Sequence, residues 1–309
     1  MAKRRQSLAA PRRRGAPRVA VVIKRTTYRK FLVEEHDPLL TRLIKRRDVT
    51  VTRILQSHKD HEATVREVEQ ALEALGANVI FRGRPRARVP SPVDLVLTIG
   101  GDGTLLAASH LTADHVPLLG INSAPEPSVG FFCGAKQGSV RETLERAFEG
   151  SLLGTELTRM RVDLNGKVLH ARVLNEALCY HTSPEATSRY ILRLAAGEEE
   201  QRSSGLWIGP AAGSTAAQRS AGGKVLPLAS TKLQYVVREP YTPAGGHFRF
   251  AMGLVEDNGV LTLRSKMRES KLFLDGHRIV HDVTIGDVVT MRRSKESLTV
   301  LGIAGKRRV

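Results

Sequence analysis

One stretch constrains the fold more than any other: V93-D-L-V-L-T-I-G-G-D-G-T-L-L106, where an apolar run leads into three closely spaced glycines. The apolar run predicts a buried strand over 93–99, and a helix is expected to begin at Thr104. Glycines at a strand-to-helix turn let the backbone bend sharply and let a phosphate approach the unpaired N–H groups of the helix. The stretch therefore predicts an α/β unit with a phosphate-binding turn.

The turn matches neither of the two common phosphate-binding patterns. A dinucleotide fingerprint counted from Gly101 needs a third glycine where Leu106 stands, and a Walker loop needs a lysine that is absent here. An acid inside the turn, Asp102, also needs a reason. It either caps the helix by accepting N–H bonds, or orients a substrate hydroxyl and takes its proton during phosphoryl transfer. The residues alone leave both alternatives open.

Residues 18–150 alternate between β-branched runs and segments of helical periodicity, which predicts βαβ units and a mostly parallel, Rossmann-like sheet. Gly76 stands where a glycine that ends a helix belongs. The expected strands cover 19–23, 77–81, 93–99 and 116–121, and the expected helices cover 60–75, 104–110 and 140–148.

Residues 151–309 have the pattern of a β-rich domain, made of two sheets or one curled sheet. A hairpin is predicted from segments 157–164 and 168–174, which flank the turn signal Asn165-Gly166. Further strands are expected at 190–194, 233–237, 260–264, 271–274, 288–291 and 298–301, and one helix at 214–220. The last strands are expected to pack back on the first domain.

The formal charge of +17 is concentrated near the N-terminus. Residues 1–47 hold 15 Lys and Arg against 3 Asp and Glu, so the rest of the chain carries only +5. Residues 1–17 form an arginine-rich tail, for which three readings stay open: a disordered solubilising tail, an anchor for RNA, a membrane surface or a protein, or a targeting presequence. A body of +5 suits an anionic substrate and does not require nucleic acid.

Several other site classes find little support in the sequence. No segment approaches the roughly 20 apolar residues of a membrane helix or the apolar core of a signal peptide. The two cysteines, Cys133 and Cys179, lie far apart, so we expect reduced thiols and a cytoplasmic protein. The run His58-Lys-Asp-His-Glu62 resembles a metal cluster but has no further ligand nearby, so it predicts the polar start of a helix and no metal held by the protein.

The turn G100-G-D-G-T-L-L106 resembles the signature of NAD kinases and of related diacylglycerol, sphingosine and 6-phosphofructo kinases. Later segments resemble NAD kinases in particular and follow in the same order, so the resemblance covers roughly residues 18–302. They are L119-G-I-N-S123, Gly130-Phe131-Phe132, Asn175-Glu176, the glycine-rich run from Ser203 to Gly223, L274-D-G-H277 and G286-D-V-V289. The resemblance implies an NAD kinase/diacylglycerol kinase-like fold.

Within that family the chain is most similar in motif to the plant-type NADH kinase branch. The shared features are R202-S-S-G-L206, A211-A-G-S-T-A-A217, Gln234-Tyr-Val-Val-Arg-Glu-Pro240 and His110-Leu111. Bacterial NAD kinases typically have Asp where Ser204 stands and Tyr where Ala217 stands. These departures touch the dinucleotide site, so not every contact of the family carries over to this chain.

The resemblance implies a role for individual residues. Asp102 is implied to be the general base on the 2′-hydroxyl of the adenosine ribose. The implied phosphate-loop residues are Gly100, Gly101, Gly103 and Thr104. The implied dinucleotide contacts are Asp102, Gly103, Asn175, Glu176, Arg202, Ser204, Thr215, Ala216, Ser220 and His277.

The implied reaction is phosphorylation of NAD⁺ or NADH by ATP, with Mg²⁺ held mostly by phosphate oxygens and water, in a homodimer or homotetramer. Polyphosphate stays open as the donor. The alternatives are a lipid kinase that shares the glycine turn, and a non-catalytic nucleotide sensor or RNA-associated protein. Ser204 also suggests a substrate preference: serine in place of an acid removes an attraction for the positive nicotinamide of NAD⁺, so we expect NADH to be phosphorylated at least as well.

Overall fold

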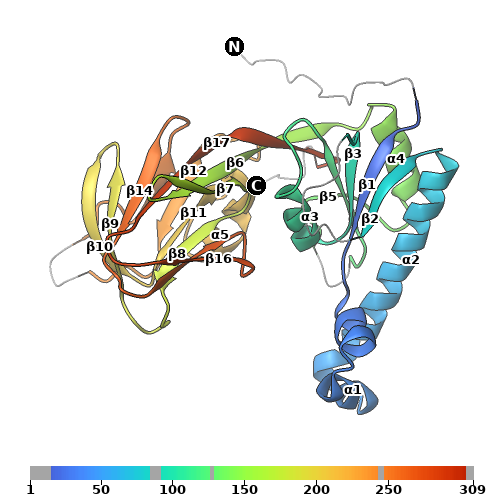
Figure 1. Ribbon diagram of the computed structural model, residues 1–309, viewed down its shortest axis with the longest axis horizontal. Helices are drawn as coiled ribbons and strands as arrows, with labels where there is room; N and C mark the ends of the chain where they lie inside the picture. The colour runs from blue at the N-terminus through green and yellow to red at the C-terminus, as the bar shows by residue number, and fades with distance from the viewer. Residues whose placement is uncertain (1–14, 84–91, 126–128, 243–246, 304–309) are drawn as a thin grey trace. The chain divides into compact units, whose positions relative to one another are not determined.

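The computed structural model describes residues 15–83, 92–125, 129–242 and 247–303 (Figure 1). Its chain contacts divide it into two compact units. Unit 1 takes the chain up to Thr155 together with the end of the last strand, from Thr299 onward, and unit 2 takes Glu156–Leu298. The arginine-rich stretch 1–14, for which disorder is one reading, lies outside the described residues.

Unit 1 is built on a sheet whose strands follow the order β2-β1-β3-β4-β5, and all neighbours run parallel. The end of β17 also pairs in parallel with β4, where Val300 faces Leu118. The predicted mostly parallel sheet is therefore confirmed. The strands are β1 (Arg18–Ile23), β2 (Asn78–Gly83), β3 (Leu95–Gly100), β4 (Leu118–Asn122) and β5 (Cys133–Lys136).

Helices cover both faces of this sheet (Figure 1). Val68 of α2 and Leu144 of α4 pack in one apolar cluster with alternate strand residues such as Leu97. Leu105 of α3 lies on the other face, so close to Gly120 that an added Cβ there would sit 3.0 Å from its side chain. The helical elements are η1 (Tyr28–Glu34), α1 (Pro38–Lys45), η2 (Val49–Val51), α2 (Thr52–Ala74), α3 (Asp102–Ser109) and α4 (Val140–Phe148).

Helix α2 departs from its prediction at its start. It begins at Thr52, so the run His58–Glu62 lies inside the helix and does not open it. His61, within this polar run, is buried at 2% exposure. The end of the helix agrees with prediction, because Gly76 follows it with a φ of +61°, a conformation that glycine adopts without strain.

Unit 2 is a pair of antiparallel sheets, which settles the choice between two sheets and one curled sheet. The strands β10-β9-β14-β17, with β6 paired to β17 and to β7, belong to the same 11-stranded sheet as the strands of unit 1. The other sheet has six strands in the order β13-β12-β11-β8-β15-β16. The strands of unit 2 are β6 (Gly154–Leu164), β7 (Lys167–Val173), β8 (Ala177–His181), β9 (Ser188–Leu194), β10 (Gly197–Ser203), β11 (Leu206–Pro210), β12 (Leu233–Val237), β13 (Met252–Val255), β14 (Val260–Ser265), β15 (Ser270–Leu274), β16 (Ile279–Val283) and β17 (Val288–Leu301).

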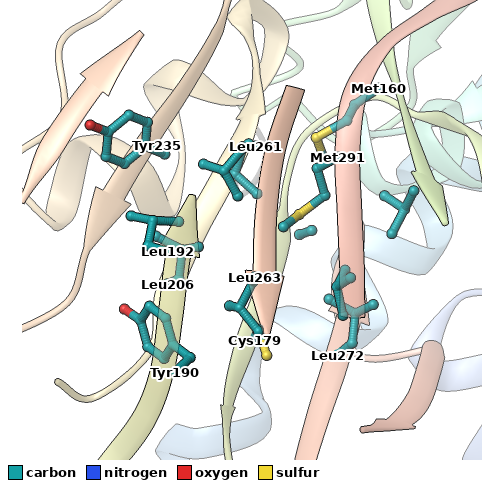
Figure 2. Close-up of a cluster of buried hydrophobic side chains, with 14 of the residues drawn as sticks. Met160, Cys179, Tyr190, Leu192, Leu206, Tyr235, Leu261, Leu263, Leu272 and Met291 are labelled. Carbon is teal, nitrogen blue, oxygen red and sulfur yellow. The ribbon is translucent and has the colours of Figure 1, made fainter. Parts of the chain in front are cut away.

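The inward faces of the two sheets form one apolar core (Figure 2). Leu263 and Met291 come from one sheet, and Leu206 and Leu272 come from the other. Inward residues alternate with more exposed ones along the strands, as the period of two in a strand requires. The core therefore fixes the register of the strands that carry the site residues of unit 2.

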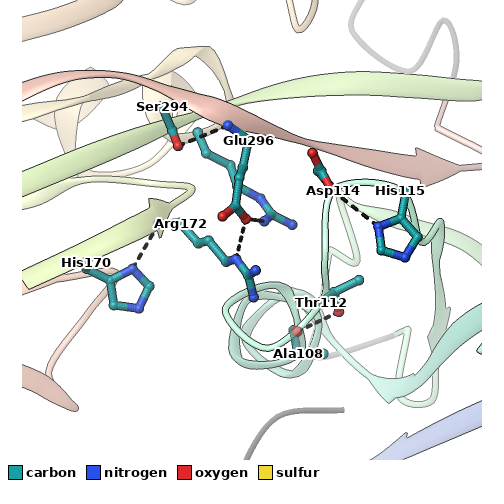
Figure 3. A network of polar contacts seen from close by, with 9 residues as sticks. Ala108, Thr112, Asp114, His115, His170, Arg172, Ser294 and Glu296 are labelled. Carbon is teal, nitrogen blue, oxygen red and sulfur yellow. Dashed lines mark hydrogen bonds and ion pairs between the residues drawn. The ribbon is translucent and has the colours of Figure 1, made fainter. Parts of the chain in front are cut away.

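A partly buried charge cluster joins β6, β7 and β17 of unit 2 (Figure 3). The Glu296 carboxylate accepts from Arg172 Nε at 2.5 Å and lies 3.7 Å from Arg159 Nη1. The side chain of Arg159 is fully buried. Burial of a charge is costly unless opposite charges and hydrogen bonds compensate it, so these contacts tie the three strands together.

Two elements of unit 2 differ from prediction. The segments 288–291 and 298–301 belong to one long strand, β17. The helix expected at 214–220 is instead a 3₁₀ turn, η3 (Ala211–Thr215), followed by the four-residue α5 (Ala217–Ser220). In the part of the chain that the structure describes, no helix combines the length and apolarity needed to cross a membrane.

Candidate functional site

The glycine turn of unit 1 joins β3 to α3 at the carboxyl edge of the sheet. Gly100 ends the strand, Gly101 is the helix N-cap, and the helix begins at Asp102. A Cβ on Gly100 would lie only 2.7 Å from the Thr104 Cβ and 3.0 Å from the Lys24 Cβ. The protein's own packing therefore requires glycine at position 100.

Gly103 is different, because the protein leaves the space beside it empty. It is exposed, its φ is not positive, and a Cβ would meet no atom within 4 Å. It lies in the first turn of α3, where helix N–H groups have no partner within the helix and carry partial positive charge. Neither backbone conformation nor packing explains this glycine, whereas a ligand lying against the turn would.

Asp102 does not cap its own helix. Its two carboxylate oxygens accept the backbone N–H groups of Phe131 and Phe132, each at 2.8 Å, and the N-cap position of α3 is taken by Gly101. The structure therefore overturns the capping alternative. A carboxylate can accept about four hydrogen bonds, so these two N–H groups fix its orientation and leave lone pairs for a hydroxyl group.

The segment that supplies these N–H groups is held in place from the sheet. Gly130 has a φ of +59°, and a Cβ there would lie 3.0 Å from the Asn122 Cβ, with the Asn122 amide nearer still. Asn122 ends β4 and faces Gly100 across the sheet. The resemblance singled out Gly130-Phe131-Phe132 without a role, and the structure gives it one as the support of Asp102.

In unit 2, Asn175 and Glu176 occupy the short connection from β7 to β8. The carboxylate of Asp275 accepts the backbone N–H groups of Leu174, Asn175 and Glu176 at 2.8, 2.6 and 3.0 Å. The backbone N–H of Asp275 in turn donates to the Glu176 carbonyl at 2.9 Å. One acidic side chain thus fixes the connection that carries both predicted contacts.

Two glycines press against the other side of this connection. A Cβ on Gly213 would lie 2.8 Å from the Asn175 Cα and much closer to the Asn175 carbonyl oxygen. A Cβ on Gly209 would lie 2.9 Å from the Glu176 Cα. Because backbone atoms cannot move aside as flexible side chains do, these positions admit glycine alone.

The Asn175-Glu176 pair carries buried polar atoms that the described residues leave without partners. They are Oδ1 of Asn175 and Oε2 of Glu176. Burial and, to a smaller extent, the negative Asp275 raise the pKa of Glu176 to about 7. Buried polar atoms without partners are rare in folded proteins, so this pair is a candidate for ligand contact.

Three further predicted contacts lie close in sequence to Gly213. Thr215 ends η3 and is half-buried, Ala216 is exposed in the bend after it, and Ser220 is exposed at the end of α5. The structure therefore brings the beginning of this glycine-rich segment against Asn175.

Arg202 and Ser204 are not brought to the same place. Arg202 is exposed on β10, and Ser204 is half-buried just before β11. Along the β8–β11 ladder, Ser204 lies beyond the end where Leu206 faces Cys179, and Asn175 lies beyond the end where Ile208 faces Ala177. That separates them by about six strand positions, or roughly 20 Å. His277 is exposed in the β15–β16 turn, two residues after Asp275.

Sequence reasoning did not assign a role to Asp275, although its signal was present. An Asp-Gly pair between two short strand-like runs marks a tight hairpin turn, and Asp275 has a φ of +50° in that turn. No feature of the sequence shows that its carboxylate reaches back to residues 174–176. The same holds for the backbone N–H groups that bind Asp102.

Comparison with known proteins gives consistent results. A family model described as the ATP-NAD kinase N-terminal domain matches residues 28–152. A probable NADH kinase of Oryza sativa subsp. japonica is 35% identical over 230 residues, which cover 68% of this chain and 71% of that protein. An NADH kinase of Arabidopsis thaliana is 33% identical over 230 residues, covering 67% of this chain and 72% of that protein.

Solved structures share the fold at low sequence identity. An NAD kinase from Archaeoglobus fulgidus in complex with ATP aligns with a TM-score of 0.66 at 19% identity, covering 94% of this chain and 95% of that one. A yeast NADH kinase complexed with NADH aligns with a TM-score of 0.68 at 15% identity, covering 93% of this chain and 83% of that one. At these identities the likeness concerns the fold alone.

Proposed function

The chain belongs to the NAD kinase family, and from that premise we propose that it transfers the terminal phosphoryl group of ATP to the adenosine-ribose 2′-hydroxyl of NAD⁺ or NADH. The observation that carries the proposal is the state of Asp102: a carboxylate at the open glycine turn, oriented by two backbone N–H groups and free of any capping role. A phosphate-binding turn with an oriented carboxylate is suited to phosphoryl transfer in which a hydroxyl group of the substrate attacks the phosphate.

Asp102 is the general base in this proposal. Its carboxylate accepts a hydrogen bond from the 2′-hydroxyl and takes the proton as the oxygen attacks the terminal phosphorus. A new O–P bond forms, the bond from that phosphorus to the bridging oxygen breaks, and ADP leaves with the electron pair. Positioning and charge stabilisation supply most of the catalysis in phosphoryl transfer, and a general base contributes about 10²–10⁴-fold.

The triphosphate is assigned to the first turn of α3, with Gly100, Gly101, Gly103 and Thr104. The open space beside Gly103 admits a phosphate oxygen close to the backbone, and the helix N-terminus favours negative charge. Among the described residues there is no group of three or more His, Cys, Asp and Glu that could hold a metal ion. Mg²⁺ bound with ATP would be held by phosphate oxygens and water and would neutralise developing charge on the phosphates.

The dinucleotide is assigned to Asn175 and Glu176. The Asn175 amide offers both a donor and an acceptor to a base edge, and the Glu176 carboxyl group accepts from ribose hydroxyls. Their partnerless buried oxygens support this assignment. Thr215, Ala216 and Ser220 follow the Gly213 contact and are assigned to the adenosine end.

The test is an assay of the purified full chain with NAD⁺ and NADH as acceptors and ATP and polyphosphate as donors, following NADP⁺ or NADPH formation. Asp102→Asn is expected to lower kcat at least about 100-fold. Thermal unfolding and ATP binding of the variant serve as controls, because an amide group would face one of the two N–H donors. More than a tenth of the kcat remaining in Asp102→Asn would remove Asp102 from the base role.

A further inference from the structure

A buried histidine lies behind the glycine turn and has no part in the proposed chemistry. His61, on α2, is 2% exposed, and its Nδ1 lies 2.8 Å from the hydroxyl oxygen of Ser123, which is 1% exposed. Burying two polar side chains is unfavourable unless they bond to each other or to the backbone. The pair therefore has a specific geometry to maintain.

The two residues that interact with His61 directly follow the two strands beside β3. Strands β1 and β4 flank β3, which ends in Gly100. Lys24 directly follows β1 and donates its N–H to the Ile99 carbonyl at 2.9 Å, and Ser123 directly follows β4 and donates its N–H to the Gly100 carbonyl at 3.1 Å. Hydrogen bonding to the backbone of Lys24 also contributes to the environment of the His61 ring. His61 thus bonds Ser123, the first residue after β4, and interacts with the backbone of Lys24, the first residue after β1, as a weaker influence on its ring.

The ring is neutral at physiological pH. The pKa of His61 is lowered to about 4, chiefly by burial; Lys24 and His58 also lower it, and Glu62 opposes them. A neutral imidazole has one donor nitrogen and one acceptor nitrogen. A hydroxyl group can both donate and accept, so Ser123 can bond Nδ1 in either tautomer of the neutral ring.

We propose that His61 is a positioning residue for the phosphoryl transfer: it fixes Lys24 and Ser123 on the two sides of Gly100 and thereby fixes the turn that carries Asp102. This inference rests on the proposed function of that turn. His61 touches no reacting atom in the proposal and acts through the backbone.

The packing of the turn explains why such a fixed frame matters. The space beside Gly100 is so tight that an added Cβ would approach both the Lys24 Cβ and the Thr104 side chain. Movement of Lys24 or Ser123 is therefore transmitted to the start of α3. A displacement of about 1 Å at reacting groups can cost about 100-fold in rate.

The experiment compares His61→Phe, Ser123→Ala and the double variant. Phenylalanine supplies an aromatic ring that cannot form hydrogen bonds, so His61→Phe leaves the Ser123 hydroxyl without its partner. Ser123→Ala leaves the His61 ring nitrogen without its partner, and both single changes lower Tm. Removing both partners together is nearly neutral for stability, so the double variant recovers Tm. His58→Phe is the matched control: His58 stacks on Tyr28 and bonds Thr26 at 3.0 Å, one turn earlier on the same helix.

If His61 positions the turn, kcat falls at least about 10-fold in both single variants and in the double variant, whereas KM for ATP and for the dinucleotide stays within about 3-fold. His58→Phe keeps kcat within about 2-fold. The proposal is wrong if kcat recovers together with Tm in the double variant, because His61 then serves packing alone, or if the single variants keep full kcat.

A measurement that does not depend on enzymatic activity tests the positioning role of His61 separately from the proposed function. Hydrogen exchange at the amides of residues 101–104 is expected to be faster in His61→Phe and Ser123→Ala than in the unmodified chain and in His58→Phe. Unchanged exchange overturns the positioning role. If the unmodified chain makes no NADP⁺ or NADPH, the proposed function fails, and the exchange result still decides whether His61 holds the turn.

Discussion

Gly103→Ala is expected to stabilise the protein and to impair the enzyme. The added methyl group meets no protein atom within 4 Å, and the residue is helical with no positive φ. Alanine is favoured over glycine within a helix by about 0.5–1 kcal/mol. The low end applies in a first turn, so the melting temperature should rise by about 1–2 °C. If a phosphate oxygen occupies the space beside Gly103, the methyl group causes overpacking of about 1–3 kcal/mol, or about 5- to 150-fold in kcat/KM.

Thermal unfolding and steady-state NADP⁺ or NADPH formation, measured on the same preparation, decide the outcome. Gly100→Ala is the contrasting variant in the same turn: its methyl group meets Thr104 and Lys24, so it should lower the melting temperature. Unchanged kcat/KM in Gly103→Ala would show that no ligand lies against this glycine. A lower melting temperature there would show that the space beside it is not empty.

Three further variants test other parts of the site. Asp275→Asn replaces one of the carboxylate oxygens that accept the N–H groups of residues 174–176. Because one hydrogen-bonded partner is lost, KM for the dinucleotide should rise about 10-fold or more while KM for ATP stays unchanged. Equal changes in both KM values would contradict the assignment of the dinucleotide to Asn175 and Glu176. Burial raises the pKa of Glu176 from 4.5 to about 7, so the folded state favours the neutral carboxyl group. This preference contributes up to about 3 kcal/mol to the free energy of unfolding at low pH, and the contribution is lost as pH rises from about 4.5 through 7. Urea unfolding at pH 5, 6, 7 and 8 should show this loss in the unmodified chain and not in Glu176→Gln. Ser204→Asp should shift kcat/KM toward NAD⁺ relative to NADH, and a strong NAD⁺ preference in the unmodified enzyme would refute the reasoning.

The elements that sequence predicts well are those whose own periodicity is complete. The helix expected at 140–148 is α4 (Val140–Phe148), and the strand expected at 233–237 is β12 (Leu233–Val237). In both, burial follows the side-chain pattern of the element itself. The prediction fails where polar residues interrupt the pattern, as in β17, in which the stretch 292–297 between two apolar runs concealed a continuous strand.

Tertiary contacts account for the parts of the site that sequence could not supply. The polar run around His61 shows no apolar face, yet the fold buries this residue because Ser123 offers it a partner from a distant strand. Strand β10, with the sequence GEEEQRS, has a composition that disfavours a strand and is formed by pairing with β9. Local sequence propensity predicts neither the bond between His61 and Ser123 nor the pairing of β10 with β9.

Two aspartates, Asp102 and Asp275, make the same kind of contact in this structure. The difference between them supports the proposed catalytic role for Asp102 and a structural role for Asp275. Asp102 and Asp275 are both aspartates whose carboxylates accept backbone N–H groups from a distant segment. Asp275 accepts three and thereby shapes the connection that carries Asn175 and Glu176. Asp102 accepts two, one on each oxygen, and stands in the first turn of α3, where the protein leaves open space beside the next residue. Under the proposed function, this arrangement commits the Asp102 carboxylate to Phe131 and Phe132, leaves the first turn of α3 available to phosphates, and leaves lone pairs that can accept the attacking hydroxyl.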